Sequence, residues 1–582
     1  MRELLRRLSL HPFLAFEITL ASLFINILSL ASPIFVIQVL NRYVGYGFDG
    51  TLITLTTGML VAGFLSHAFT IVRVRLASAV NIEPDKALSD AVLSCLARAR
   101  MSTLGRIHPA RIHELMGGIQ TVQAGYDASV LCSVLDMPFF LLFVAAVFFL
   151  SPILALITLA AVFCTLLSGW LGLRKGKFLN DAMRNESVVH RANLSNAISG
   201  ADTVRAFGGK GYLAGLFQAQ SEKIHRIKQD MVQSGTRGQA MLQSLSMLLR
   251  VLVYALGARE VVHGSLSTGG LIGVSILSGK ALSVSASFMK SRAMISQAAS
   301  MMQSLQEFMR QPLESETGTV LSDYRGALEI KDLGFAYPGS TGPLFEGLDV
   351  DLRPGNVMVI TGHNGSGKTT LVRLLLGLLD PGRGQILAGG VDIRQLSAPW
   401  WRTQIMYLPQ EPTFLNATIK ENICMNAPGL DDERVRRIVE AAGLKRYLDT
   451  SVKGLEAEIV NGGAELAVGI RRRMALARAL SVRGAVAILD EPAEGFDMEG
   501  LRIMDMVIQS MVKARKTLII VTQDMRIMQR ADIIIDLGSK PRPEVSYTAD
   551  ARKERESAGV KAESDRNTEK KSDSEPETGE VQ

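Results

Sequence analysis

The hydrophobic positions along the first half of the chain form long runs. A helix needs about 20 apolar residues to cross a hydrocarbon core of about 30 Å. Ser151-Pro152 separates two of the runs and predicts a tight hairpin tip. The pattern therefore predicts six spanning helices, near residues 14–40, 51–72, 129–150, 153–173, 240–262 and 267–290.

From about residue 328 the pattern changes to short apolar runs that alternate with helical ones. The stretches VMVIT at 357–361, VAILD at 486–490 and TLIIVT at 517–522 are typical of buried strands. This alternation indicates a parallel α/β nucleotide-binding domain. From residue 551 onward there is no Leu, Ile, Phe, Trp or Tyr, so that segment lacks the side chains of a hydrophobic core.

These changes predict a membrane α-helical bundle fused to a P-loop α/β domain. Residues 1–13 would form an interfacial elbow, and residues 14–310 a transmembrane domain with helices that extend into the cytoplasm. The nucleotide-binding domain would span residues 328–540, and residues 541–582 would be a disordered charged tail.

Composition and charge agree with this division. Apolar residues make up 47% of the chain and charged residues 20%, which fits a membrane part joined to a soluble part. The net charge is +7, but the basic residues flank the apolar runs and form no patch with interleaved aromatics, so we predict no nucleic-acid partner. The segments 73–127 and 174–239 are rich in Lys and Arg. We therefore expect the N-terminus, both segments and the C-terminal half in the cytoplasm.

Two basic residues, Arg250 and Lys280, interrupt the fifth and sixth apolar runs. A charge at membrane depth is costly, so we expect both side chains to face a polar cavity rather than lipid. A role in a substrate pathway, snorkelling to the interface and pairing with a structural partner all remain open.

A phosphate-binding motif follows the first predicted strand of the second half. GHNGSGKTT at 362–370 fits G-x-x-x-x-G-K-[ST] and precedes the apolar helical run LVRLLLGLL. The glycines let backbone amides approach phosphate, Lys368 would reach the β- and γ-phosphates, and the Thr369 hydroxyl would bind Mg²⁺. The predicted nucleotide-binding residues of this loop are Gly362, His363, Asn364, Gly365, Ser366, Gly367, Lys368, Thr369 and Thr370.

Two carboxylates close the strand VAILDE at 486–491. Asp490 would hold Mg²⁺, directly or through water, and Glu491 would act as the general base on an attacking water. Together with the phosphate loop, this pair favours ATP hydrolysis over a solvated pair of loop acids.

The order of these motifs resembles an ABC transporter half, from about residue 10 to residue 540. The resemblance implies ATP and Mg²⁺ as ligands and assigns further roles. Tyr337 in FAYPG matches the aromatic residue that stacks on adenine. Gln410 in YLPQ matches the glutamine that joins the metal site to the membrane domain, and Asp497 matches the aspartate after the catalytic glutamate.

The membrane half narrows the resemblance. SPIFVIQVLNRYV, LDMPFFLLFVAAVFFLSPILALI and GGLIGVSILSGKAL look like the bacterial type I secretion exporters. Those exporters lie in the inner membrane and move unfolded polypeptides, using a membrane-fusion adaptor and an outer-membrane duct. Exporters of small molecules or lipids share the architecture and remain the alternative.

Two motifs depart from the family pattern. Where the signature reads LSGGQ, this chain has Leu466, Ala467, Val468, Gly469 and Ile470. Ala467 lacks the hydroxyl donor, and Val468 adds a β-branched side chain where a positive φ or a close approach is wanted. Gln523 in VTQD stands where the family has a histidine near the γ-phosphate and the attacking water. It can donate a hydrogen bond but cannot carry a proton as histidine does.

These departures leave the form of the dimer open. In a homodimer both sites would combine an intact phosphate loop with a weak signature, and we expect slow turnover. In a heterodimer the weak signature would face the ATP of a different partner. A third reading is a largely non-hydrolysing subunit that binds ATP and recruits partners. The loop AEGFD at 493–497 also differs from the usual S-A-L-D ending.

Overall fold

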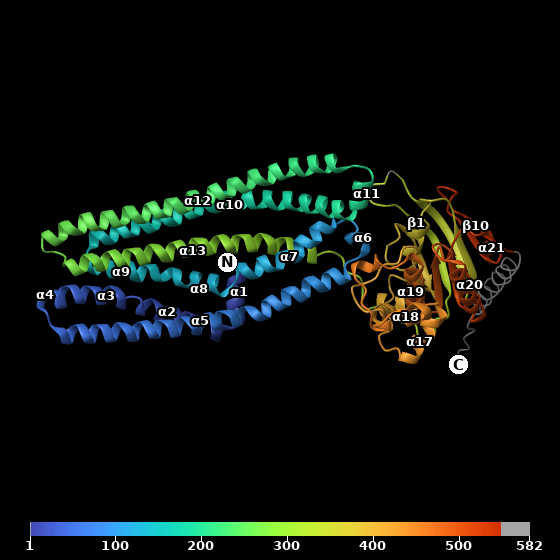
Figure 1. Ribbon diagram of the computed structural model, residues 1–582, viewed down its shortest axis with the longest axis horizontal. Helices are drawn as coiled ribbons and strands as arrows, with labels where there is room; N and C mark the ends of the chain where they lie inside the picture. The colour runs from blue at the N-terminus through green and yellow to red at the C-terminus, as the bar shows by residue number, and fades with distance from the viewer. Residues whose placement is uncertain (1, 341, 549–582) are drawn as a thin grey trace, which may run out of the picture. The chain divides into compact units, whose positions relative to one another are not determined.

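The computed structural model describes residues 2–340 and 342–548, which form two compact units. The first comprises the chain up to Pro312 apart from Arg100–Ser102, and the second comprises Arg100–Ser102 and the chain from Leu313 on. Long helices make up the first unit, and the second unit contains all the strands of the described residues (Figure 1).

Six helical segments of the described residues are long and apolar enough to cross a membrane. They confirm the predicted number, and each predicted run lies inside one of them apart from Ser267, the N-cap of the last. Their bounds are Pro12–Tyr46, Asp49–Arg98, Pro109–Leu150, Pro152–Ser199, Lys210–Val262 and Thr268–Met309.

Several of these segments are single helices far longer than a membrane span. α5 (Asp49–Arg98), α10 (Pro152–Ser199), α12 (Lys210–Val262) and α13 (Thr268–Met309) each continue without a break into the charged segments that separate the apolar runs. Figure 1 shows α10, α12 and α13 running side by side over much of their length. The expected helical extensions are therefore present.

Shorter helices complete the first unit. They are α1 (Arg2–Leu10), α2 (Pro12–Leu28), α3 (Ala31–Gln38), α4 (Val44–Tyr46), α7 (Pro109–Gly125), α8 (Ala128–Asp136), α9 (Phe140–Leu150) and α11 (Ala201–Ala206), with a π-helical turn at Val39–Tyr43. Ser151 caps α10 by accepting a hydrogen bond from the Leu154 N–H, and Pro152 occupies the first turn. The predicted hairpin tip is thus a helix N-cap.

Two basic residues, one near the N-terminus and one in the segment 73–127, lie inside this unit and pair with other helices. Arg7 is 1% exposed and contacts Asp85 at 2.8 Å and the Asn81 Oδ1 at 3.0 Å. Arg73 lies within α5 and donates to both carboxylate oxygens of Asp136, at 2.8 and 3.0 Å. These cations join helices to one another, so they carry less information on membrane orientation than the sequence suggests.

The two basic residues of the apolar runs do not face the cavity of this unit, in contrast to the expectation from the sequence. Arg250 and Lys280 are both exposed on the first unit. The unit has a cavity of about 660 Å³ between α7, α10, α12 and α13, and neither residue lines it.

The second unit is built on two sheets. An antiparallel sheet has the strand order β2-β1-β4-β5, with β1 (Leu328–Phe335), β2 (Phe345–Leu352), β4 (Arg383–Ala388) and β5 (Val391–Asp392). A six-stranded sheet has the order β10-β9-β3-β8-β7-β6, with β3 (Val357–Thr361), β6 (Ile405–Leu408), β7 (Val486–Asp490), β8 (Thr517–Val521), β9 (Ile533–Asp536) and β10 (Glu544–Tyr547). Its strands are parallel except for β10.

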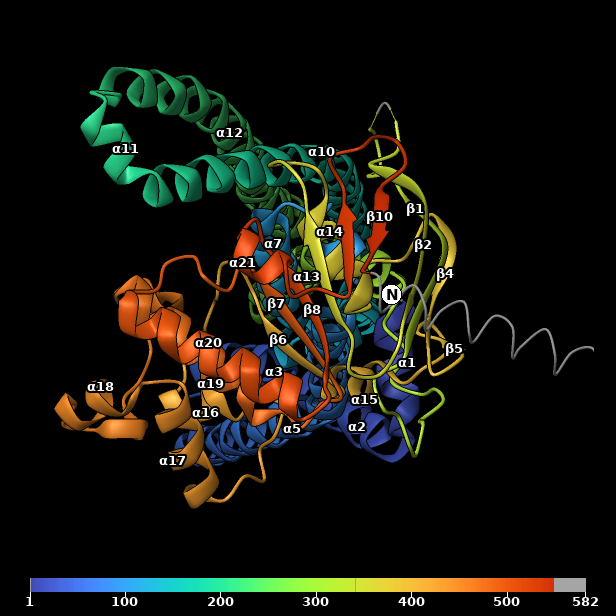
Figure 2. The same cartoon turned by 90° about the vertical axis from the view of Figure 1, so that its right-hand side faces the viewer.

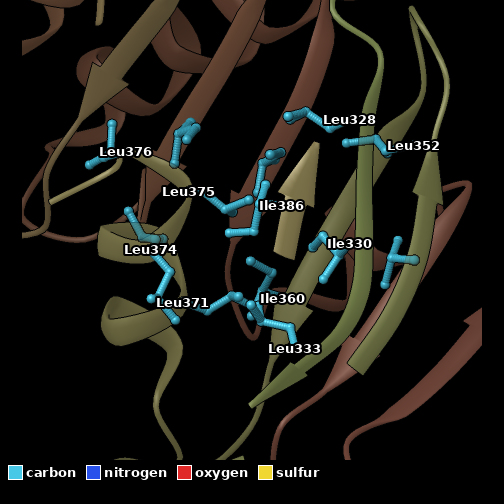
Figure 3. Packing of buried hydrophobic residues seen from close by; sticks show 14 of the residues in the cluster. Leu328, Ile330, Leu333, Leu352, Ile360, Leu371, Leu374, Leu375, Leu376 and Ile386 are labelled. Carbon is cyan, nitrogen blue, oxygen red and sulfur yellow. The ribbon is translucent and has the colours of Figure 1, made fainter. Parts of the chain in front are cut away.

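Alternate side chains of the parallel strands enter two different cores, because successive side chains of a strand point to opposite faces. In β3, Met358 and Ile360 belong to the core shared with the antiparallel sheet, whereas Val357 and Val359 belong to the other. Figure 3 shows the first core, where α14 (Lys368–Leu375) packs against β1, β2 and β4.

Helices cover the opposite face of the parallel sheet. The second core contains side chains from α16 (Ile419–Ile423), α17 (Asp432–Ala441), α19 (Val468–Ser481) and α20 (Met498–Lys513). Figure 2 shows β6, β7 and β8 side by side with α19 and α20 near them. The short helices α15 (Ala398–Thr403), α18 (Lys445–Thr450) and α21 (Met525–Met528) complete the unit. The predicted parallel α/β domain is confirmed.

The C-terminal edge of this unit corrects one prediction. Residues 541–582 were expected to form a disordered tail, but Glu544–Tyr547 forms β10 and pairs with β9. Val545 and Tyr547 alternate along this strand and pack against the first core. This segment therefore has the apolar side chains that are scarce from residue 551 onward. Residues 549–582 of the predicted tail lie outside the described residues.

Candidate functional site

The phosphate loop connects the C-terminal end of β3 to the N-terminus of α14. Gly362, Gly365 and Gly367 have φ of 137°, 80° and 108°, a region that L side chains rarely adopt. A Cβ at Gly362 would lie 2.7 Å from the Ser366 Oγ, and one at Gly367 would lie 2.8 Å from the Leu344 Cδ2. Glycine is therefore required at two positions by both conformation and space.

Polar side chains in and beside the loop meet at the Gly362 carbonyl oxygen. Lys368 donates from Nζ to the Gly362 carbonyl oxygen at 2.9 Å and reaches the His363 carbonyl oxygen at 3.4 Å. Gln523, which follows β8, donates from Nε2 to the same Gly362 oxygen at 2.9 Å. The buried Ser366 Oγ has no hydrogen-bond partner among the described residues. This open cradle with an unused hydroxyl fits a phosphate chain.

The remaining loop residues lie where the motif predicts. His363 and Asn364 are exposed, Thr369 follows Lys368 in the first turn of α14, and Thr370 is buried. The Thr370 Oγ1 is 2.9 Å from the hydroxyl of Tyr337, a residue that is 42% exposed. The rings of Tyr337 and Phe335 are perpendicular, with their centroids 4.9 Å apart. Tyr337 therefore lies beside the loop and is partly exposed, and its stacking on adenine stays a prediction.

Asp490 ends β7 in a setting that disfavours its charge. It is 1% exposed, and neither carboxylate oxygen has a hydrogen-bond partner among the described residues. Burial and the neighbouring Glu491 raise the pKa of Asp490 to about 6, against the opposing effect of Lys368. Two unpartnered carboxylate oxygens beside a phosphate loop fit a divalent cation.

The chemistry of the donors favours Mg²⁺. Among the described residues there is no cluster of three or more His, Cys, Asp or Glu side chains that could hold a metal. Mg²⁺ is commonly held by one or two protein oxygens together with substrate phosphates and water. The Thr369 hydroxyl and Asp490 would hold it here, and the bound ion would neutralise charge on the phosphates.

Glu491 follows with an unusual backbone. Its φ is 49°, which is rare for a residue with a side chain, and its N–H donates to the Val521 carbonyl oxygen at 2.9 Å. Burial raises the pKa of the Glu491 carboxyl, Glu494 adds to this shift, and Lys368 opposes it. A carboxylate with a raised pKa at this position suits a general base.

Gln410 lies at the end of β6 but does not contact the predicted metal ligands. Its Nε2 donates to the Glu494 Oε2 at 3.1 Å, and the same oxygen is 3.5 Å from the Arg472 Nη2. In the sequence, the loop AEGFD differs from the family pattern, but no role is predicted for Glu494 or for Arg472. Asp497 of that loop caps α20 by accepting from the Gly500 N–H at 2.7 Å, and it also accepts from Arg473 at 2.8 Å.

The signature segment forms the N-terminus of α19. Ala467 is the N-cap, and no side chain caps the helix. Val468 is the first helical residue and is 53% exposed, and it is absent from the residues with positive φ. The expected conflict with a positive φ at Val468 is therefore wrong, because Val468 has helical backbone angles in the first turn of α19. Only its bulk at the exposed tip remains as an obstacle.

Comparisons with known proteins agree with this arrangement. Residues 15–285 match the ABC transporter transmembrane region, and residues 345–494 match the ABC transporter family. The leukotoxin translocation ATP-binding protein LktB of Mannheimia haemolytica is 26% identical over 529 residues, which are 89% of this chain and 73% of that protein. The leukotoxin export ATP-binding protein LtxB of Aggregatibacter actinomycetemcomitans is 25% identical over 533 residues, 90% of this chain and 74% of that protein.

A solved structure shares the fold. It is a bacterial Atm1-family ABC exporter with ATP bound, which superposes with a TM-score of 0.81 at 18% identity and covers 98% of this chain and 100% of that one. The two family matches account for the membrane helices and the nucleotide-binding domain in turn. The chain belongs to the ABC transporters, as a multi-pass half-transporter similar to the leukotoxin exporters.

Proposed function

We propose that this chain is the ATP-binding and ATP-hydrolysing subunit of a type I secretion exporter that moves a polypeptide out of the cytoplasm. The observation that carries this proposal is the extent of the similarity to the two leukotoxin proteins, which runs through both the membrane region and the ATPase domain. Those two proteins are named for the translocation and the export of leukotoxin.

The cavity of the first unit supports a polypeptide substrate. Glycines from three helices line it (Gly117, Gly118, Gly169, Gly172, Gly176, Gly235 and Gly238), together with side chains of both charges (Glu114, Lys177, Asp181, Arg184 and Arg191). Methionine side chains pack against Gly118 and Gly169, but the other five glycines have open space where a Cβ would stand. That space leaves room for an extended chain, and mixed charges can meet polar side chains and backbone amides. Apolar side chains, among them Leu173, Met231 and Met289, also line the cavity, so it suits the alternative of a small molecule or lipid as well.

The ATPase chemistry follows from the residues of the site. The phosphate loop and Lys368 bind the phosphates, Thr369 and Asp490 hold Mg²⁺, and Glu491 takes a proton from the attacking water. Tyr337 stacks on adenine, and Gln523 approaches the γ-phosphate. The Gln410 side chain either binds the metal ion or lies beside the metal site.

We also propose a location and partners for this chain. The chain lies in the bacterial inner membrane, with its N-terminus and ATPase domain in the cytoplasm. A second ABC half, identical or different, supplies the signature that faces this phosphate loop. A membrane-fusion adaptor and an outer-membrane duct continue the path of the polypeptide.

The proposal is tested by reconstitution in proteoliposomes with and without the Glu491→Gln substitution. We expect Glu491→Gln to retain nucleotide binding and to lose ATP hydrolysis and uptake of a polypeptide encoded beside this gene. Equal hydrolysis by both proteins would contradict the motor. ATP-driven movement of lipid or a small molecule, without polypeptide uptake, would favour the alternative exporter class.

One observation favours a second candidate function, a weakly hydrolysing subunit of a heterodimer. The tip of α19 has no capping side chain and exposes Val468, so it offers the opposite nucleotide fewer donors than a serine-capped tip. Purification in mild detergent distinguishes the cases. A second, different ABC half in stoichiometric amount would identify the heterodimer, whereas the chain alone as a dimer would favour the homodimer.

A further inference from the structure

The loop after the catalytic glutamate contains a carboxylate that the nucleotide chemistry does not use. Glu494 lies three residues beyond Glu491, and its Oε2 accepts a hydrogen bond from the Gln410 Nε2 at 3.1 Å. The Glu494 N–H donates to the Glu491 carbonyl oxygen at 3.1 Å, which closes the turn between the two glutamates. Glu494 therefore links the loop of the general base to the loop of Gln410.

A buried arginine holds both loops in place. Arg472 of α19 is 5% exposed, and its Nη2 lies 3.5 Å from the Glu494 Oε2. Its Nη1 donates to the carbonyl oxygen of Pro409, the residue before Gln410, at 3.4 Å. The neighbouring residues of α19, Arg473 and Met474, are also buried. Since this helix is packed in the core, Arg472 is a fixed anchor for Glu494 on one side and for the backbone of the Gln410 loop on the other.

The contact with Glu494 determines which end of the Gln410 amide is free. An ionised carboxylate accepts hydrogen bonds and donates none, so only the NH₂ group of the amide can face it. The Gln410 Oε1 is then the end that points away from Glu494. An amide oxygen is a ligand for Mg²⁺, whereas an amide nitrogen is not. With a serine or alanine at position 494, neither end of the amide would be selected in this way.

We propose that Glu494 is a positioning residue for Mg²⁺-dependent nucleotide binding. It acts through Gln410 by holding the amide with its oxygen free toward the metal site, where Asp490 has two unpartnered oxygens. Arg472 keeps Glu494 in register for this task. The inference rests on the proposed function only as far as binding of ATP with Mg²⁺, and it requires no turnover.

The test is a Mg²⁺ titration of nucleotide binding in the full-length protein. A fluorescent ATP analogue is used as the probe, and every variant carries Glu491→Gln so that hydrolysis does not consume the probe. We expect Glu494→Ala to raise the Mg²⁺ concentration for half-maximal binding about three- to tenfold, the effect of losing one solvent-exposed hydrogen bond. Glu494→Gln should show a smaller rise, because it retains an acceptor oxygen but no longer selects one end of the amide. Binding in excess EDTA should stay unchanged in both.

A double-mutant cycle separates positioning from charge. In a Gln410→Ala background, Glu494→Ala should no longer change the Mg²⁺ requirement, because the group it positions is absent. A general effect of removing a negative charge near the cation would persist in that background and would overturn the proposal. A lower Mg²⁺ requirement in Glu494→Ala would also overturn it, since Glu494 would then be withdrawing Gln410 from the metal.

The matched control is Glu499→Gln. Glu499 also follows the catalytic glutamate, but its Oε2 lies 3.6 Å from the Arg473 Nη2. Within the described residues it forms no hydrogen bond or ion pair with Gln410 or Arg472. We expect its Mg²⁺ requirement to match that of the parent protein. Failure of the proposed function and failure of this inference are distinguishable, because a protein that binds Mg²⁺-ATP without transporting anything can still show the effect of Glu494.

Discussion

The phosphate loop and the signature tip of the ATPase domain are two loops that each lead into a helix N-terminus. At α14 the N-cap is Gly367, and polar groups from Lys368 and Gln523 converge on the Gly362 carbonyl. At α19 the N-cap is Ala467, and no side chain of the described residues makes a capping hydrogen bond to the first N–H groups. The backbone device is the same in both places, but the side-chain chemistry is present in only one.

The difference shows that the position of a helix and its chemistry have separate causes. Leu466 and Ile470 pack against the second core on either side of the signature tip, so apolar contacts hold the start of α19. Ala467 and Val468 between them are exposed and contribute little to that packing. Polar groups at the tip can therefore be lost while the helix stays in place.

The largest effect should follow from damage to the intact loop. Lys368→Ala removes the charge that would meet the β- and γ-phosphates, and we expect ATP binding to weaken about a hundredfold or more, since charge-assisted contacts are lost together. Titration with a fluorescent nucleotide measures this. The control is Lys331→Ala in β1, where the lysine pairs with Glu329 on the surface. Equal binding by both variants would mean that the loop does not hold the nucleotide.

Asp490→Asn should separate binding from stability. Its carboxylate is buried without a partner and has a pKa of about 6, above the usual value near 4 in an unfolded chain. The folded state thus binds the proton more tightly, so the ionised carboxylate destabilises it above pH 6. We expect Asp490→Asn to stabilise the nucleotide-free domain by up to roughly 3 kcal/mol above pH 6 and to lose Mg²⁺-dependent binding.

The stability gained by Asp490→Asn should depend on pH, and this dependence tests the prediction. The stabilising effect should shrink as pH falls from about 6 to below 4, where the wild-type carboxyl becomes protonated in both states. Thermal unfolding at several pH values, with Asp449→Asn on the exposed face of α18 as control, measures the difference. A gain that is the same at pH 4.5 and pH 7.5 would point to a cause other than the charge.

Much of this contrast could be predicted from the sequence, for a physical reason. Backbone motifs that need glycine are visible in the residues themselves, so GHNGSGKTT at 362–370 predicted its own loop and helix. Apolar runs of membrane length likewise predicted all six spanning segments, because length and composition are enough to set them. Short apolar runs predicted the buried parallel strands for the same reason.

What the sequence did not reveal depends on contacts between distant segments. Arg73 and Asp136 are 63 residues apart and meet only because α5 packs beside α8. Glu494 meets Gln410 across 84 residues of chain. The strand β10 was missed because four alternating residues, EVSY, are too short to stand out beside a polar tail, although β9 offers them a partner. Side-chain partners of this kind follow from topology and not from local pattern.

Restoring the signature tip should have an intermediate effect. Ala467→Ser supplies a side-chain oxygen to the N–H groups of α19, and we expect about 1 kcal/mol of added stability. With Val468→Gly added, the tip can approach an opposite γ-phosphate, and ATPase turnover should rise about tenfold, as expected for one recovered charge-assisted hydrogen bond. The control is Ala464→Ser, the same change at an exposed position before the helix. No gain in turnover would show that the signature side does not limit the reaction.

The smallest effect should come from the phosphate-loop side, at Gln523. Its Nε2 already donates to the Gly362 carbonyl, and Gln523→His can place an imidazole N–H in the same position. Because the side chain is exposed, most of the imidazole should be neutral at pH 7.5, so we expect only a two- to fivefold rise in turnover and no change in ATP affinity. Steady-state ATPase assays beside nucleotide titrations measure both quantities. A larger rise in turnover with Gln523→His than with the restored signature would show that the phosphate-loop side limits ATP hydrolysis. The signature tip would then be the less damaged of the two loops.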